Sequence, residues 1–216
     1  MKQRPPCVDK LRRIEKRRLQ QVAPNPRRFP DRWTDYDPVG KDMAGTRFVA
    51  FKTPLRHDYF LNRSNEFDVR NANAVGKQLG LIIDLTATQK YYDPREWTDI
   101  GIKYEKIWCT GHHLHLQVEN IQKFYRIVSD FLSKHIYTGE LIGVHCTHGL
   151  NRTGYMICRY LIEVDGWDVN SAIERKYAAL SVKYPREPIN GIISKRLAQL
   201  KNVLPCIDLN EFVAIN

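Results

Sequence analysis

The chain has 216 residues, of which 43% are hydrophobic and 27% charged, and its formal net charge at pH 7 is +10. This length is sufficient for one domain with a hydrophobic core, and no apolar stretch approaches the roughly 18 residues of a membrane span. The first residues are polar and basic, unlike a signal peptide, and the five cysteines form no CxxC pair. These features argue against a membrane protein and a disulfide framework, and they predict an intracellular protein in a reducing compartment.

The excess positive charge is concentrated at the beginning of the chain. Residues 1–32 contain eleven Lys and Arg against three Asp and Glu. We expect residues 1–29 to form a basic, flexible tail, which is either a solvated segment without a specific partner or an electrostatic arm for nucleic acid. The basic run from Lys10 to Arg18 also has the composition of a nuclear localisation signal, which predicts a nuclear protein.

Predicted strands and helices alternate after this tail. Short apolar runs bounded by turn residues predict strands over residues 46–51, 80–85, 104–108 and 141–145. Apolar residues at helical spacing predict helices over residues 65–79, 118–136, 153–164, 169–180 and 188–204. This alternation predicts an α/β sandwich over residues 30–205, followed by a tail over 206–216, with the ligand site at the carboxyl ends of the strands.

The most informative segment is the loop between the strand over 141–145 and the next helix. The loop begins at Cys146 and ends at Arg152, and Thr153 follows at the start of the helix. In such an arrangement, the loop amides and the positive end of the helix dipole converge on one point and form a cradle for an anion. The residues whose amides would line this cradle are Thr147, His148, Gly149, Leu150 and Asn151.

The same electrostatic field predicts a reactive cysteine. A positive environment lowers the pKa of a thiol, so we expect Cys146 to be a thiolate, and therefore a nucleophile, near neutral pH. Arg152 can offer parallel hydrogen bonds to two phosphate oxygens, and the Thr153 hydroxyl can donate to the sulfur when it leaves in a second step. The alternative, a buried structural cysteine near an unrelated arginine, does not account for the spacing of these residues.

The sequence LIGVHCTHGLNRTG, residues 141–154, resembles the signature loop of the cysteine-dependent protein tyrosine and dual-specificity phosphatases. Within this superfamily it is most similar to the RNA 5′-triphosphatase branch. That branch contains the triphosphatase domain of animal mRNA-capping enzymes, the baculovirus phosphatase and the stand-alone RNA/RNP-interacting phosphatases. Further segments that fit the branch are residues 30–33, 45–48, 51–55, 82–88, 91–93 and 101–104.

This resemblance implies a protein tyrosine phosphatase-like sandwich, with a central mixed, mostly parallel sheet flanked by helices. It implies that the substrate is an RNA with a 5′-triphosphate or 5′-diphosphate end, that RNP proteins are partners, and that no cofactor is needed. Asp84 resembles the strand-end carboxylate of the capping-enzyme branch, which would order the loop or a catalytic water, although it could equally cap the turn after its strand. We further expect a monomer that does not associate with membranes.

The loop before the helix over 118–136 lacks an acid that related protein phosphatases possess. Those enzymes use an Asp there to protonate the departing oxygen, but residues 109–118 contain no carboxylate, and Glu119 is expected to open the helix. A phenol, with a pKa of about 10, needs that proton to leave, whereas the departing oxygen of a diphosphate, with a pKa of about 6, does not. The missing Asp therefore favours an anhydride substrate, such as the γ-phosphate of a 5′-triphosphate, and by extension the β-phosphate.

The predicted mechanism consists of two in-line displacements. Cys146 takes the phosphoryl group, and water then hydrolyses the cysteinyl-phosphate. Arg152 and the loop amides hold the equatorial oxygens throughout, so the reaction needs no metal ion. We expect His145, directly before the nucleophile, to order the backbone and tune the thiolate rather than to transfer protons.

Residues outside the loop are candidates for binding the rest of the substrate. The basic side chains among them would receive the β- and α-phosphates, and Tyr92 would stack on a base together with Tyr91 and Trp97, unless these aromatic rings pack a loop against the sheet. The four substrate-binding candidates are Lys90, Tyr92, Arg95 and Arg186. The histidines at positions 112, 113 and 115 have no matching Cys or carboxylate, so no metal site is predicted.

Two other functions remain open. The chain could be a dual-specificity protein phosphatase that acts on phosphotyrosine or phosphoserine, with His113 or His115 in place of the missing Asp. It could also be a non-enzymatic RNA- or RNP-binding module. The absence of the Asp argues against the first function, and the presence of Cys146, Arg152 and Thr153 argues against the second.

Overall fold

The computed structural model of the protein describes residues 27–61, 66–73, 76–111 and 113–179. Several predicted features lie outside these described residues, and the structure does not test them. They are the basic tail up to residue 26, the helix over 188–204, Arg186, His112 and the carboxyl-terminal segment.

A sheet of four parallel strands forms the centre of the fold. The strands are β1 (Phe48–Lys52), β2 (Leu79–Asp84), β3 (Lys103–Lys106) and β4 (Leu141–Cys146), in the spatial order β1-β4-β2-β3. Among the described residues, every strand pair is parallel, and an antiparallel bridge between Val39 and Phe51 is isolated. The described sheet is therefore parallel rather than mixed.

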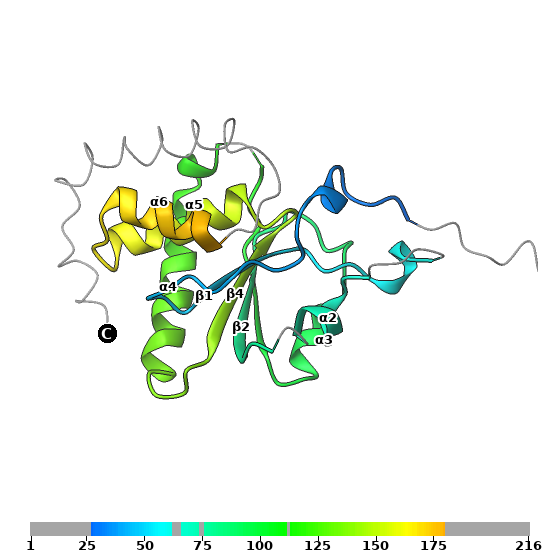
Figure 1. Cartoon of the computed structure of the whole chain (residues 1–216), viewed down its shortest axis with the longest axis horizontal. Coiled ribbons are helices and arrows are strands. Elements are labelled where there is room, and N and C mark those ends of the chain that lie inside the picture. Colours follow the sequence, from blue (N-terminus) through cyan, green and yellow to red (C-terminus); the bar gives the residue numbers. More distant parts are fainter. Residues whose placement is uncertain (1–26, 62–65, 74–75, 112, 180–216) are drawn as a thin grey trace, which may run out of the picture.

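Helices cover both faces of this sheet, with α4, α5 and α6 on one face and α2 and α3 on the other (Figure 1). The α-helices are α2 (Val69–Asn73), α3 (Arg95–Thr98), α4 (Val118–Lys134), α5 (Asn151–Glu163) and α6 (Val169–Ala179). Short 3-10 helices span Trp33–Asp35, His57–Tyr59 and Leu114–Leu116. Among the described residues, no helix is both long enough and apolar enough to cross a bilayer.

The alternating side chains of the strands fill two hydrophobic cores, one on each face of the sheet. Leu81 and Ile83 of β2 face the core beneath α4 and α5, where they join Phe124 and Met156. Ile82, between them, faces the second core with Trp97. Since both faces are covered, β1, β2 and β4 are almost entirely apolar, as expected of buried parallel strands.

The predicted strands are confirmed, and two of the predicted helices differ from the structure. The helix expected over 65–79 is only Val69–Asn73 in the described residues, because Gly76 adopts a φ of +73° and β2 already begins at Leu79. The helix after the cysteine loop begins at Asn151 rather than Thr153, which places Arg152 in its first turn. The sequence analysis did not predict α3, a four-residue helix that follows Pro94.

Candidate active site

The carboxyl ends of the parallel strands converge at one edge of the sheet. Cys146 is the last residue of β4, and it is in register with Lys52, the last residue of β1. Asp84, at the end of β2, is in register with His145 on one side and with Lys106 on the other. The sheet therefore places the predicted nucleophile and the predicted strand-end carboxylate on neighbouring strands at the same edge, as the sequence indicated.

The Cys146 thiol has the properties of a nucleophile. The residue is only 3% exposed, and burial by itself raises the pKa of the thiol. The positive charge of Arg152, the Thr153 hydroxyl and the backbone amides of Thr153 and His148 act in the opposite direction and prevail, so the pKa lies below its ordinary value. The buried Thr153 hydroxyl has no other partner among the described residues and is available to the sulfur.

Arg152 is held in place by three elements of the fold. Its Nη1 donates to the carbonyl of Leu85, 3.1 Å away, and to the carbonyl of Cys109, 2.9 Å away. Its Nη2 donates to the Thr147 hydroxyl at 2.9 Å. Leu85 and Cys109 follow β2 and β3, and Thr147 follows β4. The half-buried guanidinium is thus fixed in orientation by the ends of three strands before any substrate binds.

The loop between Cys146 and Arg152 lies directly against β1. Thr53 donates its amide to the carbonyl of Thr147 at 3.2 Å. Gly149 adopts a φ of +73°, and a Cβ at this position would lie 2.5 Å from the carbonyl oxygen of Phe51. His148 Nε2 is 2.7 Å from the carbonyl oxygen of Asp31, which ties the loop to the segment before β1. His148 therefore braces the loop, whereas Asn151 is exposed.

A buried polar cluster, formed by Asp84, Lys106, His145, Tyr92 and Tyr104, lies behind the loop. Asp84 Oδ2 accepts hydrogen bonds from Lys106 Nζ at 2.8 Å and from the Tyr104 hydroxyl at 2.9 Å. The Tyr92 hydroxyl and His145 Nε2 lie 2.6 Å apart, and His145 Nε2 is 3.9 Å from Asp84 Oδ1. Asp84 therefore holds the ends of β2 and β3 together, and its Oδ1 also caps the turn after β2 by accepting a hydrogen bond from the Thr86 amide at 2.7 Å.

The protonation of this cluster excludes Asp84 and His145 as proton donors at neutral pH. Burial raises the pKa of Asp84, but the nearby His145 and Lys106 lower it by more, so the carboxyl group stays ionised. Burial lowers the pKa of His145 to about 4, which keeps its ring neutral. A charged carboxylate and a neutral buried imidazole can order the backbone and the loop, and this matches the positioning role expected of His145.

The structure corrects the prediction that Tyr92 binds the substrate. Tyr92 is only 5% exposed, and its hydroxyl is occupied by His145, so its ring offers no face to a base. Tyr91 and Trp97 are buried in the same way. All three belong to the core on the α2 and α3 face of the sheet. The free energy gained by burying their apolar rings explains why they are not left exposed for a ligand.

The other substrate-binding candidates differ in their surroundings. Lys90 is exposed, with Nζ 5.5 Å from the centroid of the Tyr91 ring. Arg95 is exposed and forms an ion pair of 2.7 Å with Asp93. Within the described residues, neither side chain forms a hydrogen bond or ion pair with the loop that follows Cys146, so their binding to a substrate remains a prediction.

His113 and His115 follow Cys109, whose carbonyl accepts a hydrogen bond from Arg152, by four and six residues. His113 is exposed in a left-handed conformation, with a φ of 53°, and its ring centroid lies 6.0 Å from that of His115. Within the described part of the chain, no three His, Cys, Asp or Glu side chains gather as metal ligands.

Two lysines near the site were not singled out by the sequence analysis. Tyr104 and Lys106 are two residues apart in β3, so the sequence could have indicated that they lie on the same face of the strand. Lys176 of α6 is 2% exposed and passes directly over Gly154, where a Cβ would lie 2.1 Å from Lys176 Cε. Burial lowers the pKa of Lys176, and the lysine is brought here by tertiary packing that no local pattern signals.

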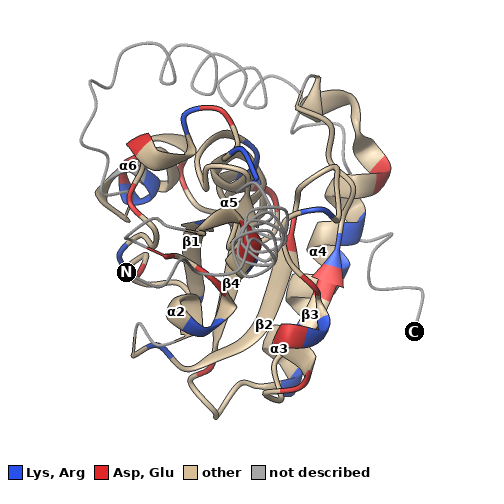
Figure 2. Cartoon of the chain, turned by 90° about the vertical axis from the view of Figure 1, so that its right-hand side faces the viewer, with Lys and Arg blue, Asp and Glu red and all other residues tan. Residues whose placement is uncertain are grey.

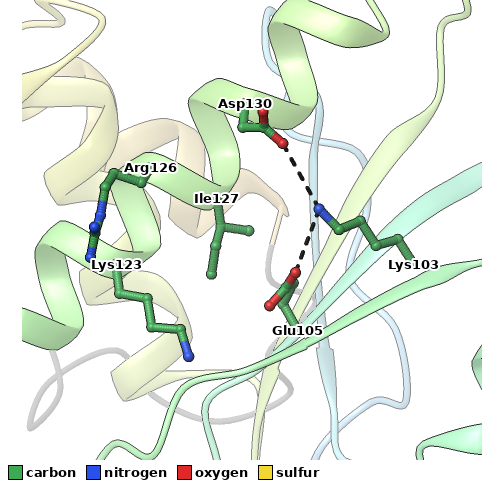
Figure 3. Close-up of a pocket in the computed structure, with 6 residues that line it drawn as sticks. All are labelled: Lys103, Glu105, Lys123, Arg126, Ile127 and Asp130. Atoms are coloured by element: carbon green, nitrogen blue, oxygen red, sulfur yellow. Dashed lines mark ion pairs between the residues drawn. The ribbon is translucent and has the colours of Figure 1, made fainter. Parts of the chain in front are cut away.

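An open groove of about 350 Å³ lies away from this site, between β3 and α4 (Figure 3). Lys103 Nζ lies 3.5 Å from Glu105 and 3.9 Å from Asp130, so opposite charges meet within the groove. Acidic and basic residues are likewise interspersed along α3, β3 and α4 (Figure 2). None of its lining residues has a thiol or a hydroxyl; they are Lys103, Glu105, Lys123, Arg126, Ile127 and Asp130.

Comparison with known proteins gives concordant matches. Residues 60–189 match the family model described as the dual specificity phosphatase catalytic domain. The chain is 48% identical over 155 residues to the RNA/RNP complex-1-interacting phosphatase homolog of Caenorhabditis elegans, covering 68% of this chain and 66% of that protein. It is 41% identical over 162 residues to the tyrosine-protein phosphatase of Autographa californica nuclear polyhedrosis virus, covering 74% of this chain and 95% of that protein.

A third relative is the mRNA-capping enzyme of Danio rerio, which is 39% identical over 150 residues, covering 67% of this chain and 25% of that enzyme. The matched part amounts to 66% of the nematode RNA/RNP complex-1 relative and 46% of the human one. Among solved structures, PTPMT1 superposes with a TM-score of 0.51 at 16% identity, covering 76% of this chain and 97% of that chain. That similarity supports the fold.

A first prediction concerns the close approach of Gly149 to β1. In a Gly149→Ala variant, the Cβ would clash with the Phe51 carbonyl, and we expect the affinity for inorganic phosphate, measured by calorimetry, to fall about tenfold or more. Gly139 provides a matched control, because its φ of +72° is similar but a Cβ there would meet no described atom within 4 Å. Gly139→Ala should lose about 1 kcal/mol of stability and keep its phosphate affinity. Equal loss of affinity in both variants would refute this role of Gly149.

A second prediction concerns the hydroxyl of Thr153. A hydrogen bond to a charged group contributes about 1.5–3 kcal/mol. Thr153→Val should therefore raise the pKa of the Cys146 thiol by roughly one to two pH units. The measurement is the pH dependence of iodoacetamide alkylation at Cys146, identified by peptide mapping. The rate rises as the thiolate forms, so its midpoint should lie below that of an ordinary cysteine in the unaltered protein and move upward in the variant. An unchanged midpoint would mean that Thr153 does not stabilise the thiolate.

Proposed function

The chain belongs to the dual-specificity phosphatase family, and on this basis we propose that it is an RNA 5′-triphosphatase and diphosphatase. Its substrate would be the γ-phosphate, and then the β-phosphate, of an RNA 5′ end. The observation that carries the proposal is the absence of a carboxylic acid from the segment that joins β3 to α4, whose Cys109 carbonyl contacts Arg152. Residues 109–117, which follow β3, contain no carboxylate, and the Asp84 carboxylate is paired with the Lys106 ammonium, which keeps it ionised.

The geometry supports a two-step reaction. In the first step, the Cys146 thiolate attacks the γ-phosphorus in line, forming a P–S bond as the P–O bond to the β-phosphate breaks and the diphosphate end leaves as an anion. In the second step, water attacks the cysteinyl-phosphate and the P–S bond breaks. The two hydrogens of the water remain on the released dihydrogen phosphate, and the sulfur leaves as a thiolate that accepts a hydrogen bond from Thr153.

The strand ends supply the electrostatic part of catalysis. Arg152 is held in a fixed orientation beside the loop, and its guanidinium and the loop amides can both bind the equatorial oxygens of the transferred phosphoryl group. Since the donors are already oriented, little reorganisation accompanies the reaction. No group in this scheme needs to donate a proton to a diphosphate leaving group, whose pKa is about 6.

The names of the relatives are consistent with this substrate class. Two of them refer to an RNA/RNP complex or to mRNA capping. A second function is suggested by the viral relative, which is named a tyrosine-protein phosphatase. In that case His113 or His115 would have to replace the missing Asp as the proton donor.

The experiment that tests the proposal compares the two substrates directly. Release of phosphate from a γ-labelled 5′-triphosphate RNA is measured in the presence of EDTA, beside release from a phosphotyrosine peptide. We expect RNA turnover to exceed peptide turnover by at least about a hundredfold, to survive chelation and to disappear in Cys146→Ser. Cys158→Ser is the matched control, because Cys158, in α5, is buried like Cys146. This variant should retain activity. Faster turnover of the peptide would contradict the proposal.

A further inference from the structure

Trp108 is an exposed aromatic residue at the catalytic edge of the sheet. It lies two residues beyond the end of β3 and is 51% exposed. The described chain buries Trp33 and Trp97 almost completely and packs Trp167 against the larger core. Other large apolar side chains are also exposed, among them Tyr137 and Ile136, so what distinguishes Trp108 is its position beside the ends of the strands, where a ligand of the Cys146 loop can meet it.

The backbone of Trp108 is tied closely to the catalytic arginine. The next residue, Cys109, accepts the hydrogen bond from Arg152 Nη1 at 2.9 Å, and the carbonyl of Trp108 itself accepts one from Asn120 Nδ2 at 3.0 Å. One peptide unit separates successive Cα atoms by 3.8 Å, so the Trp108 Cα lies within about 10 Å of the guanidinium. A ligand whose terminal phosphate reaches Arg152 can therefore also reach the indole.

One face of the indole is occupied by a cation. Lys106 and Trp108 are two residues apart on the same side of the extended chain, and Lys106 Nζ lies 5.1 Å from the centroid of the Trp108 ring. The same ammonium is fixed by Asp84 and by the Thr86 hydroxyl, at 2.8 Å and 2.6 Å. The ring is thus held from one side, and among the described residues about half of the Trp108 surface is exposed.

We propose that Trp108 is the platform on which the first base of the RNA 5′ end stacks while the γ-phosphate lies in the Cys146 loop. This inference rests on the proposed function and specifies its nucleotide subsite. A rigid, exposed indole can stack on any base, so the subsite would recognise an RNA end irrespective of its sequence. The nearby ammonium of Lys106 adds positive charge on the path of the α- and β-phosphates.

The test compares a substrate that has a base with one that lacks it. The variants are Trp108→Ala and Trp108→Phe, and the substrates are a 5′-triphosphate RNA oligonucleotide and inorganic tripolyphosphate. Trp108→Ala should lower kcat/KM for the RNA about tenfold, mainly through KM, and leave tripolyphosphate hydrolysis unchanged, whereas Trp108→Phe should retain most of the RNA activity. Tyr137→Ala is a matched control, because Tyr137 is 96% exposed and precedes β4 at the opposite edge of the sheet.

Each other outcome would overturn the assignment. Equal loss with both substrates would mean that Trp108 supports the position of Arg152, and no loss with either would mean that the indole is not a subsite. A phosphotyrosine peptide is assayed beside the two phosphate substrates, and a loss confined to this peptide would assign the ring to a protein substrate. Should the unaltered protein not hydrolyse RNA, the proposed function fails. RNA binding to Cys146→Ser, with and without Trp108→Ala, then decides whether the stacking subsite exists.

Discussion

The orientation of the Arg152 guanidinium is the constraint on which the site depends. Arg152 lies in the first turn of α5. Its guanidinium donates hydrogen bonds to carbonyl oxygens that follow β2 and β3 and to the Thr147 hydroxyl. These groups meet only because the strands are parallel and end at the same edge. The fixed charge in turn lowers the pKa of Cys146, which burial alone would raise. The register of the sheet and the reactivity of the thiol are therefore parts of the same arrangement.

Behind the loop, the buried polar cluster keeps charged groups at the strand ends without giving the site an acid. Buried charges are costly unless they are paired and hydrogen-bonded. Asp84 meets that condition through Lys106, Tyr104 and the amide of Thr86. The same partners keep the carboxyl group ionised, while burial keeps His145 neutral. Among the described residues, the strand ends therefore combine oriented hydrogen-bond donors with carboxyl and imidazole groups that do not release a proton, which suits a leaving group that is already a weak base.

Much of the fold could be predicted from local pattern. The runs at 80–85 and 141–145 indicated buried parallel strands, because residues on both faces are apolar, and the helical spacing after residue 118 indicated α4. The short helices were harder to predict. α3 has four residues, too few to show a period, and α2 is cut short by the glycine turn before β2. The length of such elements depends on tertiary contacts more than on propensity.

The loop from Cys146 to Arg152 could be located from sequence because its parts are contiguous, whereas the surroundings could not. The sequence suggested that Tyr92 contacts a ligand, but Tyr92 is buried. Its burial depends on packing with α3 and on the contact with His145, which is distant in the sequence. The exposure of Trp108 could not be predicted, because the pattern of a short strand does not reveal whether other elements cover its end. Lys106 and Lys176 reached the site only through packing between elements.

The central claim is that the leaving group departs without a proton from the protein. The most direct measurement is the dependence of kcat/KM on the leaving-group pKa over a series of aryl phosphates, since this parameter reports the step that forms the cysteinyl-phosphate. The account predicts a steep fall in rate as the leaving group becomes more basic. A flat dependence in the unaltered protein that becomes steep in a His113→Ala or His115→Ala variant would contradict it, because a histidine would then be the missing acid.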